Sequence, residues 1–222
     1  MLRTLTAILA GLILFIAAVF WPAGTIDWLA GWVYVGLVAA SMIVTVALVR
    51  RINPELIERR LQVGEGTKRW DRIWSAIFRP LFVFIHMVAG LDAMRFAWST
   101  MSPWLWPVGF ALFASGMALV AWSMVVNRFF ETNVRIQTDR GHRVIDAGPY
   151  AIVRHPGYVG FAGWCLAVPM MLGSWWAFVP AVLAVVSLAV RTAMEDRTLR
   201  EELPGYADYV GRVGYRLIPG IW

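Results

Sequence analysis

The sequence has little charge and almost no cysteine. Only 15% of its 222 residues are charged, while 59% are hydrophobic and thirteen are Trp, which exceeds the apolar content of an ordinary soluble domain. The single Cys165 lies in an apolar run, so no intrachain disulfide can form and a packing role is expected. No G-x-G-x-x-G pattern follows a strand, which excludes the common dinucleotide-binding fold. This composition is typical of a membrane protein.

Several apolar stretches are long enough to cross a bilayer, which takes about 20 helical residues. Four such spans are predicted, at residues 5–23, 28–49, 77–98 and 103–126. The run 158–190 is too long for one crossing and is interrupted at 172–175, so it predicts a hairpin of two short helices, with kinks at Pro169 and Pro180. The expected fold is an all-α polytopic membrane protein with about five to six transmembrane helices. Because no small-x-small cleavage site follows the first span, that span is expected to be a retained anchor.

The basic residues predict the orientation of the chain. Eight of them lie in 50–79, five in 127–154 and five in 191–222, whereas the loops 24–27 and 99–102 have none. Since Lys and Arg near spans stay on the cytoplasmic side, both termini and the polar loops are expected there, and the cell inner membrane is the expected location. The net charge of +6 then reflects topology and attraction to anionic membrane lipids, with no nucleic-acid partner.

Ionisable groups in the third span are functional candidates by default. Asp92 and Arg95 are three residues apart, which predicts that they pair with each other. For His86 two interpretations stay open, because it could line a substrate cavity or bond a backbone carbonyl.

A polar cluster precedes the hairpin, at residues 148–160. Pro156 suits the first turn of a helix, whose N-terminal end would attract an anionic group. His155 and Tyr158 are three residues apart and share one side. At the other foot of the hairpin, Arg191 and Glu195 have i,i+4 spacing and share one face, so both feet are predicted to converge on one site.

A structural interpretation of the same residues is also open. Arg154 and His155 would then be interfacial anchors, and Gly157, Gly160 and Gly163 would allow close helix packing. Arg191 and Glu195 would form only a local ion pair, which contributes about 0.3 to 0.5 kcal/mol.

Spaced motifs of the C-terminal half resemble one superfamily, that of the isoprenylcysteine carboxyl methyltransferases and phospholipid methyltransferases. The motifs are Gly148-Pro149-Tyr150, Arg154-His155-Pro156-x-Tyr158-x-Gly160, Glu195-Asp196, Pro204-Gly205-Tyr206-Ala207-Asp208-Tyr209 and Arg216-Leu217-Ile218-Pro219. The resemblance covers roughly residues 127–222. The chain departs from it at Asp196, where Glu is usual, and at Gly214, where a basic residue is frequent.

The resemblance implies an integral membrane enzyme that binds S-adenosylmethionine in a cytoplasmic pocket near the last hairpin. Carried over position by position, it assigns the cofactor contacts to Gln137, His142, Arg143, Val144, Ile145, Tyr150, His155, Pro156, Gly157, Tyr158 and Glu195. Arg191 matches a position that contacts the substrate carboxyl group, and Arg191 and Glu195 are the expected catalytic residues. No metal is expected.

The expected function is therefore transfer of a methyl group to a lipophilic or lipid-modified acceptor that enters from the bilayer. An isoprenylcysteine carboxylate and a phospholipid amine both remain open as acceptors. Two alternatives are a membrane reductase that uses NADPH and resembles the sterol reductases, and a non-catalytic binding or assembly protein. One membrane domain is expected over 1–222, with plain spans in 1–126 and the cofactor-binding half in 127–222.

Overall fold

The computed structural model describes residues 2–60, 62 and 64–222, and every regular element within these ranges is a helix. In chain order the elements are α1 (Leu2–Ala23), α2 (Leu29–Ile52), α3 (Pro54–Arg60), α4 (Arg69–Gly90), the π-helix η1 (Leu91–Phe96), α5 (Leu105–Val126), the 3-10 helices η2 (Thr138–Arg140) and η3 (Gly148–Ala151), α6 (Pro156–Leu172), α7 (Phe178–Glu202) and α8 (Tyr206–Arg212).

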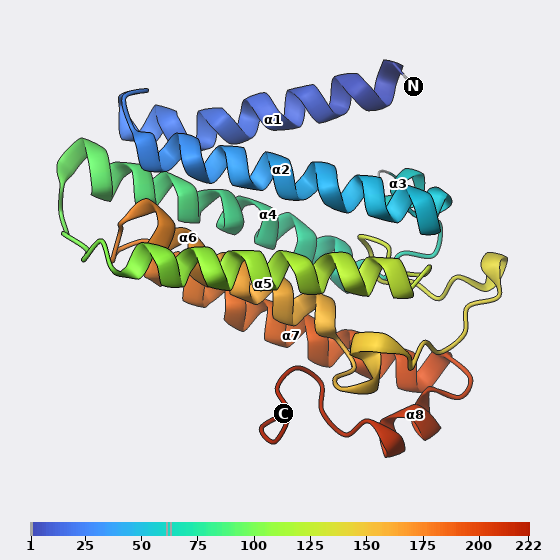
Figure 1. The fold of residues 1–222 in the computed structure, drawn as a ribbon. Helices are drawn as coiled ribbons and strands as arrows, with labels where there is room; N and C mark the ends of the chain where they lie inside the picture. The colour runs from blue at the N-terminus through green and yellow to red at the C-terminus, as the bar shows by residue number, and fades with distance from the viewer. Residues whose placement is uncertain (1, 61, 63) are drawn as a thin grey trace.

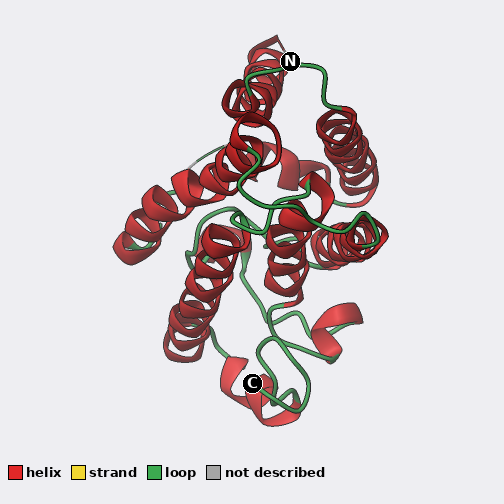
Figure 2. Cartoon of the chain, turned by 90° about the vertical axis from the view of Figure 1, so that its left-hand side faces the viewer, coloured by secondary structure: helices red, strands yellow, loops and turns green. Residues whose placement is uncertain are grey.

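The long helices run side by side and form a bundle. Figure 1 shows the short α3, the polar loops and α8 gathered at one end of it, on the right, and Figure 2 views the bundle after a quarter turn. Four helices are long and apolar enough to span a membrane, at Leu29–Ile52, Arg69–Phe96, Leu105–Val126 and Phe178–Glu202, and two shorter apolar ones lie at Ala10–Ala23 and Pro156–Leu172. The predicted all-α polytopic membrane fold is confirmed.

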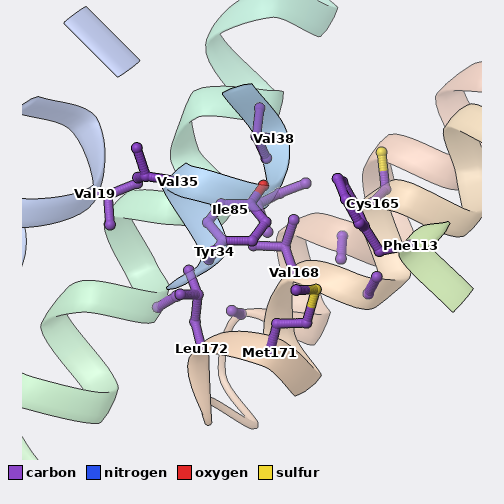
Figure 3. Packing of buried hydrophobic residues seen from close by; sticks show 14 of the residues in the cluster. Val19, Tyr34, Val35, Val38, Ile85, Phe113, Cys165, Val168, Met171 and Leu172 are labelled. Atoms are coloured by element: carbon purple, nitrogen blue, oxygen red, sulfur yellow. The ribbon is translucent and has the colours of Figure 1, made fainter. Parts of the chain in front are cut away.

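The core is apolar and draws on helices from the whole chain. Figure 3 shows side chains of α1, α2, α4, α5 and α6 packed together, among them Val19, Tyr34, Ile85, Phe113, Cys165 and Val168. The pairing of α5 with α6 is the most extensive. It depends on Gly116 and Gly160, because a Cβ atom on Gly160 would collide with the carbonyl oxygen of Gly116. Small residues at a membrane helix interface allow this close approach.

One hydrogen-bonded chain of polar side chains crosses the core. The Trp164 indole donates to the Tyr34 hydroxyl at 2.9 Å, and Tyr34 lies 2.8 Å from His86 Nε2. His86 Nδ1 lies 2.9 Å from the Phe82 carbonyl, which can only accept, so Nδ1 carries the hydrogen. Of the two interpretations of His86, the structure therefore favours the bond to a backbone carbonyl.

Three sequence predictions about the helices are wrong in detail. The third long helix begins at Arg69 rather than at residue 77, since Arg69, Asp71 and Arg72 lower the hydropathy of its first turns without ending the helix. The second arm of the hairpin is not short, because α7 continues to Glu202. Pro180 lies in the first turn of α7, where a missing N–H costs no intrahelical bond, so it needs no kink.

The spacing predicted that Asp92 pairs with Arg95, but each of the two side chains has other partners. The buried carboxylate of Asp92 accepts from the Ser99 backbone N–H at 2.7 Å, and from the hydroxyls of Ser99 and Ser174 at 2.6 Å each. Arg95 instead donates to the Trp21 carbonyl at 3.1 Å. The π-helical turn of η1 widens the helix at this point. Asp92 thereby ties α4 to the turn between α6 and α7 at the end of the bundle away from α8.

Replacing Asp92 with Ala should destabilise the fold. The change leaves buried donors of Ser99 and Ser174 without an acceptor, which should lower the free energy of unfolding by about 2–4 kcal/mol. Arg95→Gln is the matched control, because its partner is a single exposed carbonyl, and it should cost under about 1 kcal/mol. Denaturant titration in mixed micelles measures both values. Equal losses in the two variants would contradict the role given to Asp92.

Candidate functional site

A pocket opens where the feet of α6 and α7 meet the polar loops. Its enclosed volume is about 90 Å³, and about 780 Å³ when the open solvent at its mouth is included. The residues that line it come from the loop after α5, the start of α6, the lower half of α7 and α8. They are Asn127, Phe129, Phe130, Glu131, Asn133, Val134, Arg135, Gln137, His142, Arg143, Val144, Ile145, Tyr150, Arg154, His155, Gly157, Tyr158, Arg191, Glu195, Leu199, Leu203, Tyr206 and Tyr209.

The start of α6 forms one wall. His155 is the N-cap residue and Pro156 occupies the first helical position, as predicted. The rings of His155 and Tyr158 stack with centroids 5.8 Å apart. Gly157 faces Phe130, and a Cβ atom at this position would overlap the Phe130 ring. Only a glycine therefore lets the loop after α5 pack against the first turn of α6 in this way.

Asp196 on α7 holds the pocket together from behind. The carboxylate is fully buried, and five side chains bond or pair with it, namely Arg154, His155, Arg200, Tyr206 and Arg216. Arg154 contacts both oxygens, at 2.7 and 3.2 Å. Backbone bonds from Arg154 to the Tyr215 carbonyl and from His155 to the Arg216 carbonyl add the C-terminal segment. We call this set the Asp196 clamp.

Glu195 and Arg191 both face the pocket but do not pair with each other. The Tyr158 hydroxyl donates a short hydrogen bond to Glu195 Oε2. Arg191 forms an ion pair with Asp71 of α4, with Nε 2.9 Å from Oδ1, and its guanidinium lies over the rings of Trp74 and Tyr158. The interpretation of Arg191 and Glu195 as a local ion pair is therefore wrong.

The loop after α5 is rigidified by a second set of charges. Arg135 donates to both oxygens of Glu131, at 2.8 and 3.0 Å, and to Asp139 at 2.8 Å. The hydrogen bond to Glu131 raises the pKa of Arg135 above its usual value. The loop is fastened to α3 because Arg60 donates to the Phe130 carbonyl at 2.8 Å. A long segment without regular structure thus keeps a defined shape.

Gln137 and His142 both contact Phe129 and so hold the two ends of this loop together. Gln137 is buried and donates from Nε2 to the Phe129 carbonyl at 2.8 Å. The His142 ring packs on Phe129 at 4.5 Å, and its Nδ1 accepts from the Gln137 backbone N–H at 3.3 Å. Burial lowers the pKa of His142 to about 4. The imidazole is therefore neutral at pH 7.

Most residues that the sequence singles out do come together. Every predicted site residue lines the pocket except Pro156, which is buried at the start of α6. No individual site role was predicted for the residues of 127–135, for Asp71, or for Tyr206 and Tyr209. Asp196 was noticed only as half of a motif. Its position beside Glu195 was a signal, whereas nothing in the sequence connects Asp71 with Arg191.

The pocket combines groups of opposite charge. The carboxylate of Glu195 attracts a cation and the guanidinium of Arg191 attracts an anion, whereas Glu131 is already paired with Arg135. Within the described residues, no three His, Cys, Asp or Glu side chains are arranged to hold a metal ion. The site can therefore bind a cationic molecule and place it near an anionic group.

The lowered pKa of His142 predicts a pH-dependent stability. In the unfolded chain a histidine takes up its proton near pH 6.5, but His142 in the folded protein does so only near pH 4. The stability that the neutral His142 contributes is therefore complete above pH 6.5 and is lost as the pH falls toward 4. Between pH 7.5 and pH 4.5 the wild type should therefore lose on the order of 1 kcal/mol more unfolding free energy than His142→Gln. This loss appears as a larger fall in the melting temperature of the wild type. A difference between the two proteins that does not change with pH would show that His142 is not neutralised by the fold.

One protein family and one solved structure are similar to this chain. The model of the isoprenylcysteine carboxyl methyltransferase (ICMT) family matches residues 108–201, which hold all the predicted site residues. A search of curated proteins finds no match. A solved structure, the eukaryotic intramembrane Ras methyltransferase ICMT without a monobody, is similar with a TM-score of 0.56 and 17% identity, over 96% of this chain and 75% of that chain. The chain is thus a membrane protein like the isoprenylcysteine carboxyl methyltransferases, matching their family over residues 108–201 and sharing the fold of the eukaryotic protein.

Proposed function

We propose that this protein transfers a methyl group from S-adenosylmethionine to the carboxylate of an isoprenylcysteine-like acceptor. The observation that carries the proposal is the meeting of Glu195 and Arg191 in one pocket at the foot of apolar helices. The carboxylate of Glu195 suits a cationic methyl donor, and the guanidinium of Arg191 suits an anionic acceptor. The family match over residues 108–201 supports a methyltransferase.

The residues of the pocket fit the proposed donor molecule. S-adenosylmethionine brings a methyl group on a cationic sulfonium, together with an ammonium, a carboxylate and an adenine. Glu195 supplies a carboxylate for the cationic groups. The segment 142–145 supplies backbone groups on the side that the resemblance assigns to the cofactor. Tyr158 orients Glu195 through its hydroxyl.

The reaction with a carboxylate needs no base. An oxygen of the acceptor carboxylate forms a bond to the methyl carbon, the carbon–sulfur bond breaks, and its electron pair stays on sulfur. No proton moves, so the residues of the chain act by positioning both groups and by excluding water. The Trp74 and Tyr158 rings, which cover the Arg191 guanidinium, serve to keep that part of the site dry.

Arg191 is the proposed contact for the acceptor carboxylate. Its Nε donates to Asp71, and Nη2 donates to the Thr132 carbonyl at 2.8 Å. Among the described residues Nη1 has no hydrogen-bond partner, and no buried side-chain nitrogen or oxygen is left unpaired. Nη1 therefore reaches the open pocket, where it keeps both of its hydrogens for the acceptor. Arg191 can therefore offer the acceptor fewer hydrogen-bond donors than a free guanidinium, since Nε and Nη2 are already bonded.

We also propose that the pocket faces the cytoplasm and that the chain resides in the inner membrane. The basic residues of the polar loops support this, since the loops with eight and five of them flank the pocket. The donor then comes from the aqueous side, and the acceptor enters from the bilayer.

Two variants of α7 should separate the donor and acceptor contacts. Glu195→Gln should weaken binding of S-adenosylmethionine about tenfold or more, because a charge partner is lost. Arg191→Gln should leave that affinity within about twofold but lower kcat/KM for the acceptor roughly 30- to 1000-fold, corresponding to 2–4 kcal/mol. Calorimetry and methyl transfer to N-acetyl-S-farnesylcysteine, both in proteoliposomes, measure these effects.

Glu201→Gln is the matched control, since Glu201 pairs with Arg197 on the exposed face of the same helix. It should change neither quantity. Methylation of phosphatidylethanolamine instead of the prenylated carboxylate would overturn the acceptor assignment. Binding of NADPH without binding of S-adenosylmethionine would overturn the proposal as a whole.

A further inference from the structure

The Arg191 guanidinium has a permanent partner from the other half of the chain. Asp71 lies in the first turn of α4, 120 positions before Arg191, and is completely buried. Its Oδ1 accepts from Arg191 Nε at 2.9 Å. Asp71 lies outside the matched residues 108–201.

The second oxygen of Asp71 fixes the pocket loop. Oδ2 accepts from the Val134 backbone N–H at 2.8 Å, and the neighbouring Lys68 backbone N–H donates to the Val134 carbonyl at 3.0 Å. The same carboxylate therefore holds both the loop after α5 and the guanidinium of α7.

Helix α4 also supplies the cover of the guanidinium. Trp74 lies one turn after Asp71, with its ring 4.3 Å from the Arg191 carbon Cζ, and its indole N–H is fixed on the Ser187 carbonyl at 2.9 Å. Asp71 on Nε and the Thr132 carbonyl on Nη2 hold the guanidinium in this orientation. It directs Nη1 toward the pocket.

We propose that Asp71 is a positioning residue, the standing counter-ion that holds Arg191 for the acceptor and keeps its charge paired throughout the reaction. The proposal rests on the proposed function. The acceptor arrives as an anion and leaves as a neutral ester, since the new oxygen–methyl bond removes its charge. Without Asp71, the buried Arg191 would be left unpaired whenever the pocket is empty or holds product, and such a charge is costly.

Asp71 also limits how strongly Arg191 binds the acceptor. A guanidinium already paired with one carboxylate attracts a second one less, because the two carboxylates repel each other. The acceptor carboxylate therefore stays a better nucleophile than it would be against an unpaired arginine. Asp71 thus favours turnover over tight binding of the acceptor.

Asp71→Asn tests this, because the amide keeps the size of the side chain and an acceptor for Val134 but loses the charge. We expect kcat for the prenylated carboxylate to fall about tenfold, the KM of that acceptor to fall or stay within about twofold, and the affinity for S-adenosylmethionine to stay within about twofold. A merely structural role would instead raise KM or weaken the affinity for S-adenosylmethionine. Asp71→Glu, which keeps the charge, should recover part of kcat.

Glu202→Gln is the matched control. Glu202, at the end of α7, pairs at 2.6 Å with Lys68, the N-cap residue of α4. It is partly exposed and does not contact Arg191. It should leave kcat and KM unchanged. If Asp71→Asn behaves like Glu202→Gln, or raises KM with kcat unchanged, Asp71 does not position Arg191.

The double variant Asp71→Asn/Arg191→Gln decides the pairing apart from activity. Removing both charges should give a higher melting temperature than removing Asp71 alone, since no unpaired charge stays buried. This readout also applies if Asp71→Asn folds poorly. If the double variant loses as much melting temperature as Asp71→Asn, or as much as the two single variants together, the pairing of Asp71 with Arg191 is overturned. A wild type that binds S-adenosylmethionine but methylates no carboxylate would overturn the proposed acceptor and the kinetic role of Asp71, whatever the melting temperatures show.

Discussion

One buried carboxylate holds together the parts of this protein that form its pocket. Asp196 is surrounded by Arg154 and His155 from the start of α6, Arg200 from its own helix, and Tyr206 and Arg216 from the C-terminal part. A carboxylate completely removed from water is tolerated only when it is paired and hydrogen-bonded, and here all these partners depend on it in return. The two feet of the hairpin and the tail cannot separate without leaving charges unpaired.

The membrane explains why the pocket needs such ionic ties. Inside the bilayer, helices satisfy their own backbone groups and pack through small residues such as Gly116 and Gly160. At the end of the bundle where α3 and α8 lie (Figure 1), two small apolar clusters, around Leu56 and Tyr209, take the place of the large core. Charged pairs add to them, with Asp196 behind the pocket, Arg135 in the loop, and Asp71 beside Arg191.

Much of the fold and of the pocket could be predicted from local patterns. Helix length predicts the spans, the break at 172–175 predicts the hairpin, and the spaced motifs predict most of the pocket residues. What could not be predicted depends on partners distant in sequence. Spacing suggested that Asp92 pairs with Arg95 and Arg191 with Glu195, yet Asp92 binds the serines of two loops and Arg191 binds Asp71. In a bundle, a helix–helix contact decides the partner of a buried charge, and no local pattern records it.

The Asp196 clamp can be tested without changing a residue that lines the pocket. In Asp196→Asn the buried Arg154 loses its charge partner, which should weaken binding of S-adenosylmethionine at least about tenfold, because α6 and α7 are no longer held together. Hydrogen exchange on the same protein in nanodiscs reports the backbone N–H groups of Arg154 and His155, which bond the carbonyls of Tyr215 and Arg216. Their protection should fall together with the affinity for S-adenosylmethionine. Wild-type affinity and wild-type protection in Asp196→Asn would contradict the role of the Asp196 clamp.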